Sequence, residues 1–274
     1  MKDTTTSSLD LLWGTGERPS RGPKPGLTLD RIVRAAVALA DAEGLDAVSM
    51  RRVSAELGVG TMSLYRYVPG KTELLDLMLD RVQGESLESE SRDAESRGSE
   101  SLEAGEPEPP ANWRDTVERL ARGHLALYRA HPWLLKVNEA RSLLGPNTLR
   151  GFELCLAGLT GPSGMGLSDQ ETVSVIVTVQ GFAAGIARME LQAVEAARET
   201  GVSDEDFWAA QAPFLERAMA TGRFPAVAGL AEDTFSREVD QFAFGLARLM
   251  DGFETLVSSR GKDVSGGAGA ASRR

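Results

Sequence analysis

The sequence predicts an all-α protein in which an N-terminal three-helix head is joined to a larger helical body. Two observations support this fold class. Apolar residues recur at the three- and four-residue spacing of amphipathic helices, and no segment shows the strict alternation of a half-buried strand. The chain has 274 residues, 42% of them hydrophobic, which is enough for two folded units. We place the head and its linker helix at residues 27–83 and the body at residues 111–258.

The head is expected to begin with an amphipathic helix at residues 28–43. Thr28 is a plausible cap, although the acidic partner of a capping box is absent, and Gly44 ends the helix. The apolar face of this helix consists of Ile32, Ala35, Ala36, Leu39 and Ala40. It would pack against two shorter helices that follow.

A helix-turn-helix is expected at residues 49–71. Val53 and Leu57 share one helix face, and Gly58 stands where a helix commonly ends with a positive φ. The second, recognition helix would span residues 61–67. Four of its side chains are expected to face outward: Thr61, Ser63, Arg66 and Tyr67.

The charge distribution separates the head from the rest of the chain. The formal net charge is −10, which argues against a protein that coats nucleic acid over its whole surface. Residues 18–71 hold nine basic and five acidic side chains, so this segment carries +4 and the remainder −14. A basic head on an acidic body is the electrostatic footprint of a DNA-reading module.

Residues 29–80, LDRIVRAAVALADAEGLDAVSMRRVSAELGVGTMSLYRYVPGKTELLDLMLD, resemble the N-terminal domain of tetracycline-repressor (TetR) family transcription regulators. The similarity rests on the Ala-rich first helix, the Gly-Leu-Asp turn, the Leu-Gly-Val turn, Leu64-Tyr65 and the Lys that starts the next helix. The body resembles the C-terminal domain of the tetracycline-repressor branch more loosely, through HPWLL, LGPN and GVSDEDFWAAQAPFLERAMATGRFP.

The resemblance implies roles for eight residues at DNA: Arg51, Thr61, Met62, Ser63, Tyr65, Arg66, Tyr67 and Lys71. The guanidinium of Arg51 can pair with guanine, and the first turn of the recognition helix meets base edges. The tyrosines and Lys71 would bind phosphates, which position the protein without specifying sequence. Arg66 could contact either a base or a phosphate. Met62 could instead pack in the core, and Tyr65 could expose only its hydroxyl. Arg52 is expected to face solvent or to bind a phosphate, and not to read a base.

Three segments are expected to be disordered: residues 1–26, an acidic low-complexity insertion at 84–110 and a tail at 259–274. The first contains Arg18, Arg21 and Lys24, which could form a minor-groove arm or a solvated tail. A linker helix starts at Lys71, and the resemblance makes it the lever between head and body.

The body is expected to form helices near residues 112–130, 133–142, 146–159, 168–199, 204–220 and 234–257. The resemblance places a dimer interface at Gly181, Gly185, Phe242, Leu246, Leu249 and Phe253, with intrachain core as the alternative for the Phe residues. A largely apolar ligand pocket could draw on Trp113, His124, Tyr128, Trp133, Asn138, Phe152, Gln180, Arg188 and Trp208. For each aromatic residue among these candidates, packing in the core is the default interpretation.

Enzymes are disfavoured because no nucleophile–base pair, phosphate loop or metal cluster stands at a known spacing. His124 and His131 lack a third ligand, so we expect neither a metal nor another cofactor. The single Cys155, the lack of a signal-peptide core and the lack of a membrane span favour the cytoplasm.

We therefore expect a homodimeric repressor that binds a palindromic DNA operator and is released by a small amphipathic molecule. A single helix-turn-helix makes too few contacts for specific binding, which independently favours a dimer. The alternative is a ligand-independent regulator or activator of the same fold.

Overall fold

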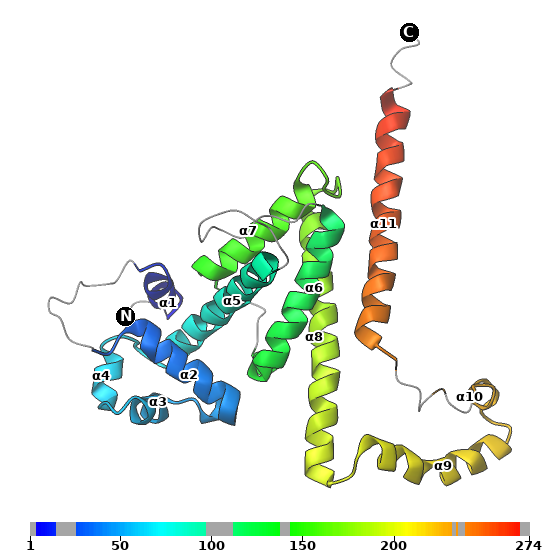
Figure 1. Cartoon of the computed structure of the whole chain (residues 1–274), viewed down its shortest axis with the longest axis horizontal. Coiled ribbons are helices and arrows are strands. Elements are labelled where there is room, and N and C mark those ends of the chain that lie inside the picture. The colour runs from blue at the N-terminus through cyan, green and yellow to red at the C-terminus, as the bar shows by residue number, and fades with distance from the viewer. Residues whose placement is uncertain are drawn as a thin grey trace.

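The computed structural model describes residues 4–14, 26–96, 112–137, 143–231, 234 and 239–268. Within these ranges the chain forms helices and turns and no strand, so the all-α prediction is confirmed. Figure 1 shows the head beside a helical body, with one helix pair projecting to the side as an arm. A continuous apolar core runs from Ile32 in the head to Leu246 in the body.

The head consists of α2 (Leu29–Glu43), the 3₁₀ turn η1 (Leu45–Ala47), α3 (Met50–Glu56) and α4 (Thr61–Tyr65). Thr28 caps α2 by accepting a hydrogen bond from the Arg31 N–H, and Ser49 caps α3 in the same way. Gly58 has a φ of +66°, which confirms the predicted turn after α3. The recognition helix ends two residues earlier than predicted.

The lever helix is α5 (Lys71–Ser96), which is separated from α4 by five residues and runs into the body (Figure 1). The prediction of disorder from residue 84 is wrong as far as Ser96, where α5 ends. The packed part of α5 has already met the cost of starting a helix, and each further residue gains one backbone hydrogen bond. Residues 97–110 lie outside the described residues.

The N-terminal segment holds a second correction. Residues 1–26 were expected to be disordered, yet α1 (Thr4–Leu12) is a helix that packs along α5. Leu11 and Leu12 contact the apolar core. Tertiary packing therefore stabilises a helix that is too short to be stable alone. The basic residues Arg18, Arg21 and Lys24 lie outside the described residues.

The body is built from α6 (Trp113–Ala130), η2 (Pro132–Lys136), α7 (Pro146–Thr160) and α8 (Asp169–Thr200). Asn112 caps α6, and Ser168 with Glu171 forms a complete capping box at α8. The helix α6 packs along α8, and α7 packs against α5, α6 and α8. The expected helix at 133–142 is a 3₁₀ turn up to Lys136, and residues 138–142 lie outside the described part.

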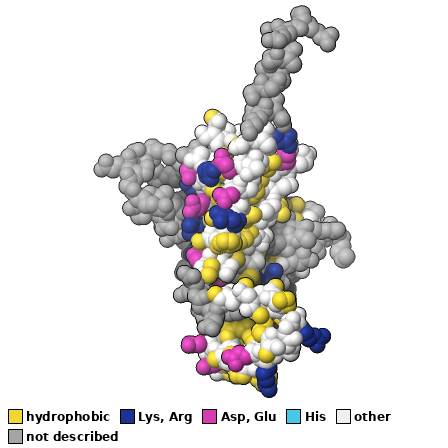
Figure 2. Space-filling model, turned by 90° about the vertical axis from the view of Figure 1, so that its right-hand side faces the viewer, with side chains coloured by type: hydrophobic (Ala, Val, Ile, Leu, Met, Phe, Trp, Pro, Cys, Tyr) yellow, Lys and Arg dark blue, Asp and Glu magenta, His cyan; other side chains and the backbone are white. Residues whose placement is uncertain are grey.

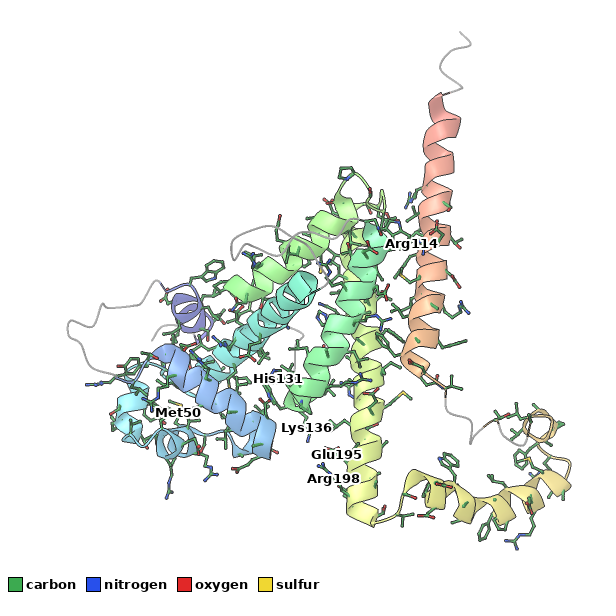
Figure 3. All side chains as sticks on the ribbon, viewed as in Figure 1. Met50, Arg114, His131, Lys136, Glu195 and Arg198 are labelled. Carbon is green, nitrogen blue, oxygen red and sulfur yellow. The ribbon has the colours of Figure 1, made fainter. Side chains whose placement is uncertain are left out.

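The arm consists of α9 (Asp204–Ala220) and α10 (Pro225–Ala228), after which α11 (Gln241–Ala268) returns beside α6 and α8. An ion pair between Arg114 and Glu254 ties α6 to α11. Figure 3 shows Arg114 on α6, on the side of that helix next to α11. The last helix starts seven residues later than predicted. It also extends through part of the expected disordered tail, as far as Ala268, because propagation from the packed part of a helix adds one hydrogen bond for each residue fixed.

One helix in the described part, α8, is long and apolar enough to cross a membrane by length and composition. No stretch of this length was expected from the sequence. The finding is weak evidence for a membrane protein, because the core helix of a soluble protein passes the same test and α8 packs along α6.

Candidate functional site

A pair of hydroxyl groups fixes the turn between α3 and α4. The Ser54 Oγ donates to the Arg51 carbonyl oxygen at 2.9 Å, so its single hydrogen is used. The Thr61 Oγ1, 2.9 Å from Ser54 Oγ, must therefore be the donor of the second bond. The expectation that Thr61 faces outward is wrong for its hydroxyl, which holds α4 against α3.

The outer face of the helix-turn-helix exposes side chains of three kinds. Met62 is 77% exposed, which contradicts a packing role for it, and Tyr65 is 44% exposed. Arg51 and Arg66 are exposed as well. Cationic, aromatic and apolar side chains are thus presented together at the surface of the head, as base and phosphate contacts require.

Ser63 and Tyr67 are only half-buried, and the ring of Tyr67 packs on the core of the head. Lys71 is exposed at the first residue of α5, where its Nζ lies 3.5 Å from the Leu45 carbonyl oxygen. Lys71 therefore stands at a helix N-terminus, where the helix dipole and the ammonium group both favour a phosphate.

The neighbouring Arg52 is engaged within the head, where it pairs with Glu43 of α2 at 2.5 Å.

A cavity of about 320 Å³ lies in the body, walled by α5, α6, α7 and α8. Its size falls within the range of small-molecule sites. The apolar part of its wall consists of Leu79, Leu120, Leu143, Leu144, Gly151, Phe152, Leu154, Cys155, Val173, Ile176 and Val177. The polar part consists of Asp76, Gln83, Thr116, Arg119, His124, Tyr128, Thr148 and Gln180.

The ring of His124 is held in one tautomer on the cavity wall. Its Nδ1 lies 3.0 Å from the Leu120 carbonyl oxygen, which can only accept, so Nδ1 carries the proton. The His124 Nε2 then accepts from the Gln180 amide nitrogen at 3.1 Å. Burial lowers the pKa of His124, although the Leu120 contact opposes this shift. The imidazole is therefore neutral at pH 7 and presents no charge to an occupant.

Four of the predicted pocket residues line this cavity: His124, Tyr128, Phe152 and Gln180. Four others do not. Trp113 is a buried core residue, and Trp133 donates its indole N–H to Asp41. Arg188 is exposed and reaches the Leu135 carbonyl oxygen, and Trp208 is exposed on α9. Asn138 lies outside the described residues.

The lever helix contributes to this cavity, although none of its residues was among the predicted pocket residues. Asp76, Leu79 and Gln83 of α5 all line it. Their spacing of three and four residues puts them on one helix face, which the sequence already showed. Within the described residues no three His, Cys, Asp or Glu side chains gather as metal ligands, and His124 and His131 serve different places in the fold.

Both parts of the chain match known families. Residues 32–78 match "Bacterial regulatory proteins, tetR family", and residues 106–257 match "Tetracyclin repressor-like, C-terminal domain". The chain is 55% identical to the HTH-type transcriptional repressor DrrR1 of Streptomyces coeruleorubidus over 258 residues, which cover 92% of this chain and 87% of that repressor. The chain belongs to the tetR family. It is a DNA-binding transcriptional repressor.

Solved structures agree with this assignment. Apo ActR from Streptomyces coelicolor matches with a TM-score of 0.59 and 32% identity, covering 85% of this chain and 98% of ActR. ActR in complex with actinorhodin matches with a TM-score of 0.60 and 31% identity, covering 84% of this chain and 98% of that chain. The regulators to which this tetR-family protein is similar thus include one whose structure holds a small molecule.

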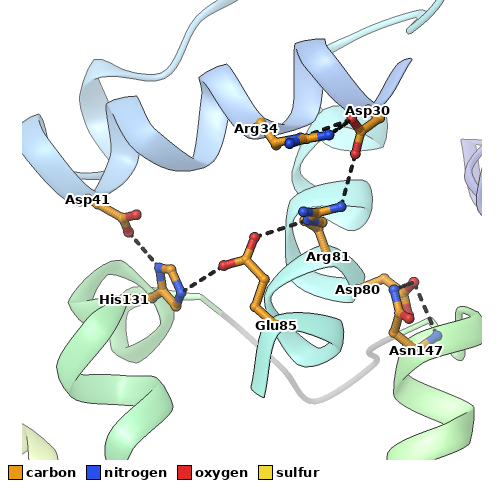
Figure 4. A network of polar contacts seen from close by, with 8 residues as sticks. All are labelled: Asp30, Arg34, Asp41, Asp80, Arg81, Glu85, His131 and Asn147. Carbon is orange, nitrogen blue, oxygen red and sulfur yellow. Dashed lines mark hydrogen bonds and ion pairs between the residues drawn. The ribbon is translucent and has the colours of Figure 1, made fainter. Parts of the chain in front are cut away.

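Polar contacts join head, lever helix and body of this tetR-family protein (Figure 4). Asp41 of α2 accepts from the His131 Nδ1 and from the Trp133 indole N–H, both at 2.7 Å. On its other side, the His131 Nε2 lies 3.7 Å from Glu85 of α5. Arg81 of α5 pairs with both Glu85 and Asp30 of α2. The head is therefore tied to the body at one end of α2 and to α5 at the other.

The expected dimer residues fall into three groups. Phe242 and Leu246 are buried within the chain, and Phe242 stacks on Phe182 at 5.6 Å. A methyl group added at Gly181 or Gly185 would meet no atom of the described residues within 4 Å. Leu249 and Phe253 are half-buried, and Phe253 packs on the core. The intrachain alternative therefore holds for Phe242.

Proposed function

We propose that this repressor binds a palindromic operator as a homodimer in the cytoplasm and releases it when a small molecule occupies the cavity of the body. The observation that carries the proposal is the dual position of α5. The helix begins at Lys71, is separated from the recognition helix by five residues and packs on α2 of the head, and its Asp76, Leu79 and Gln83 form part of the cavity wall. An occupant can therefore act on the helix that supports the DNA-reading surface. The relatives that this protein matches are transcriptional regulators, and we assign the protein no enzymatic activity.

At DNA, Arg51 would read a guanine, and Met62 and Ser63 would meet base edges. Tyr65, Tyr67 and Lys71 would bind phosphates, and Arg66 would contact either a base or a phosphate. Exposure of Arg51, Met62, Tyr65, Arg66 and Lys71 supports these roles. Thr61 would contribute through its place in the first turn of α4, because its hydroxyl is bonded to Ser54.

A homodimer is supported by the surface of α8, α9 and α11. Apolar side chains gather on the side of the molecule that Figure 2 faces, among scattered charged groups. The arm alone exposes Phe207, Trp208, Phe214 and Phe224, each by 47% or more. Exposed apolar surface of this kind marks interaction sites. The open space beside Gly181 and Gly185 would let a partner's backbone approach closely.

The effector would be a largely apolar molecule with a few polar groups. The neutral His124–Gln180 pair and the threonine hydroxyls lie among leucine, isoleucine and phenylalanine side chains. Such walls suit an amphipathic compound. Actinorhodin, which one ActR structure contains, is therefore a reasonable first probe.

The mechanism requires that the occupant bind one body conformation better than the other, because a ligand shifts an equilibrium only by its differential affinity. Moving α5 would change the separation of the two heads of a dimer. Adjacent half-sites lie about 34–36 Å apart, so a changed separation weakens binding.

The proposal is tested by selecting operator sequences from random DNA with the purified full-length chain. A gel-shift titration with and without actinorhodin then follows. We expect an enriched palindrome, a complex containing two protein chains, and release on adding the compound. Absence of a palindrome would overturn the proposal that the repressor binds DNA as a homodimer. Equal operator binding by ligand-free protein and by protein saturated with a bound compound would overturn the switch.

A further inference from the structure

The N-terminal helix α1 lies outside both segments that match the family, which begin at residues 32 and 106. It is nevertheless packed into the fold. Ser8 is fully buried, and Leu11 and Leu12 pack against the apolar core. Figure 1 shows α1 alongside α5 and near the start of α2. A helix held in this way has a structural effect on α5.

The hydroxyl of Ser8 donates to Asp76 Oδ2 of α5 at 2.6 Å. This distance is typical of a charge-assisted hydrogen bond, which is stronger than a bond between neutral groups. Asp76 also lines the cavity. One carboxylate of the lever helix is therefore bound to α1 and forms part of the proposed effector site.

The other end of α1 lies where head, lever helix and body meet. Leu11, Leu12, Trp13 and Gly14 line a surface hollow together with side chains of three other helices. These are Leu29, Asp30 and Val33 of α2, Leu77, Asp80 and Arg81 of α5, and Pro146 and Asn147 of α7. A movement of α5 relative to α2 or α7 would disturb this junction.

We propose that α1 braces the lever helix, and that Ser8 is a positioning residue which holds α5 in its DNA-competent place through Asp76. This inference rests on the proposed function. The brace rigidifies the junction on which head placement depends, so it favours operator binding. It also opposes the movement of α5 that an effector requires. By linkage, loosening the brace weakens operator binding and tightens effector binding.

The test compares Ser8→Ala with Thr5→Ala, which removes an exposed hydroxyl from the same helix. Hydrogen–deuterium exchange of residues 71–85 is measured without DNA or ligand. We expect faster exchange around Asp76 in Ser8→Ala, by about ten- to a hundredfold for the loss of one hydrogen bond to a charged group. Thr5→Ala should match the wild type. In an Asp76→Ala background, Ser8→Ala should have no further effect.

The second readout uses the selected operator, with actinorhodin as the probe. In Ser8→Ala the operator Kd should rise and the actinorhodin Kd, measured without DNA, should fall. General structural damage would instead weaken both. Unchanged exchange, or affinities that change in the same direction, would overturn the brace. If wild-type protein bound no operator, or bound actinorhodin without releasing the operator, the proposed function would fail, and the exchange measurement alone would decide for or against the brace.

Discussion

Asp80 of the lever helix caps the first turn of α7 by accepting two hydrogen bonds from Thr148. The Thr148 backbone N–H and its hydroxyl both lie 2.9 Å from Asp80 Oδ1, while Oδ2 accepts the Asn147 side-chain amide at 3.1 Å. Thr148 itself lines the cavity. The wall of the proposed effector site is thus fastened to α5 by one nearly buried carboxylate.

Replacing this carboxylate should lower stability and blunt the response to effector. Asp80→Ala leaves buried N–H and O–H donors without a partner, so we expect the free energy of unfolding to fall by about 1–3 kcal/mol. Denaturant unfolding measures this change. Glu118→Ala, which breaks an exposed pair with Arg122, is the control and should change stability by less than about 1 kcal/mol. Equal effects of the two variants would contradict the capping role.

Arg51→Ala should weaken operator binding and relax preference at one base pair of each half-site. A bidentate contact to guanine contributes about 1–3 kcal/mol of discrimination. Competition binding with operators mutated at each position measures it. Arg122→Ala, an exposed arginine on the body, should leave affinity unchanged. A uniform loss across all operator positions would assign Arg51 to a phosphate instead.

Lys71→Ala should weaken binding to every sequence equally. A lost phosphate contact lowers the slope of log affinity against log salt concentration by about one for each half-site. Titrations at several salt concentrations measure the slope. An unchanged slope would show that the Lys71 ammonium does not reach DNA.

Stability should decrease as pH falls below the unfolded pKa of histidine, about 6.5. Burial lowers the pKa of His124 in the folded protein, so the unfolded chain binds the proton more readily. The free energy of unfolding therefore falls from about pH 6.5 until the folded pKa is reached. Unfolding curves of wild type and His124→Gln between pH 7.5 and 5 measure this. A His124→Gln profile parallel to the wild type would contradict the assignment to His124.

Gly181→Leu should weaken a dimer without destabilising the single chain, because the added side chain meets open space within the described residues. The control is Ala55→Leu in α3, which adds an exposed leucine side chain to the head, outside the proposed dimer surface. Sedimentation equilibrium measures dimer dissociation. Identical association by both variants would place the dimer interface elsewhere.

The sequence by itself determined the fold class, the helix-turn-helix and most body helices. These depend on local signals that act within a few residues, such as the Thr28, Ser49 and Ser168 caps and the left-handed Gly58. Local signals also placed His124 and Gln180 among the candidate pocket residues.

Only the tertiary structure decided which of those candidates share a cavity, and that α5 contributes to it. Trp113 and Trp133 resemble pocket aromatics in sequence, yet both are buried in the core. The helix α1 has weak local signals and depends on Ser8, Leu11 and Leu12 meeting α5. Contacts between residues 68 or more positions apart, such as Ser8–Asp76 and Thr148–Asp80, depend on how whole helices pack. The short-range periodicity of the sequence does not specify which helices pack together.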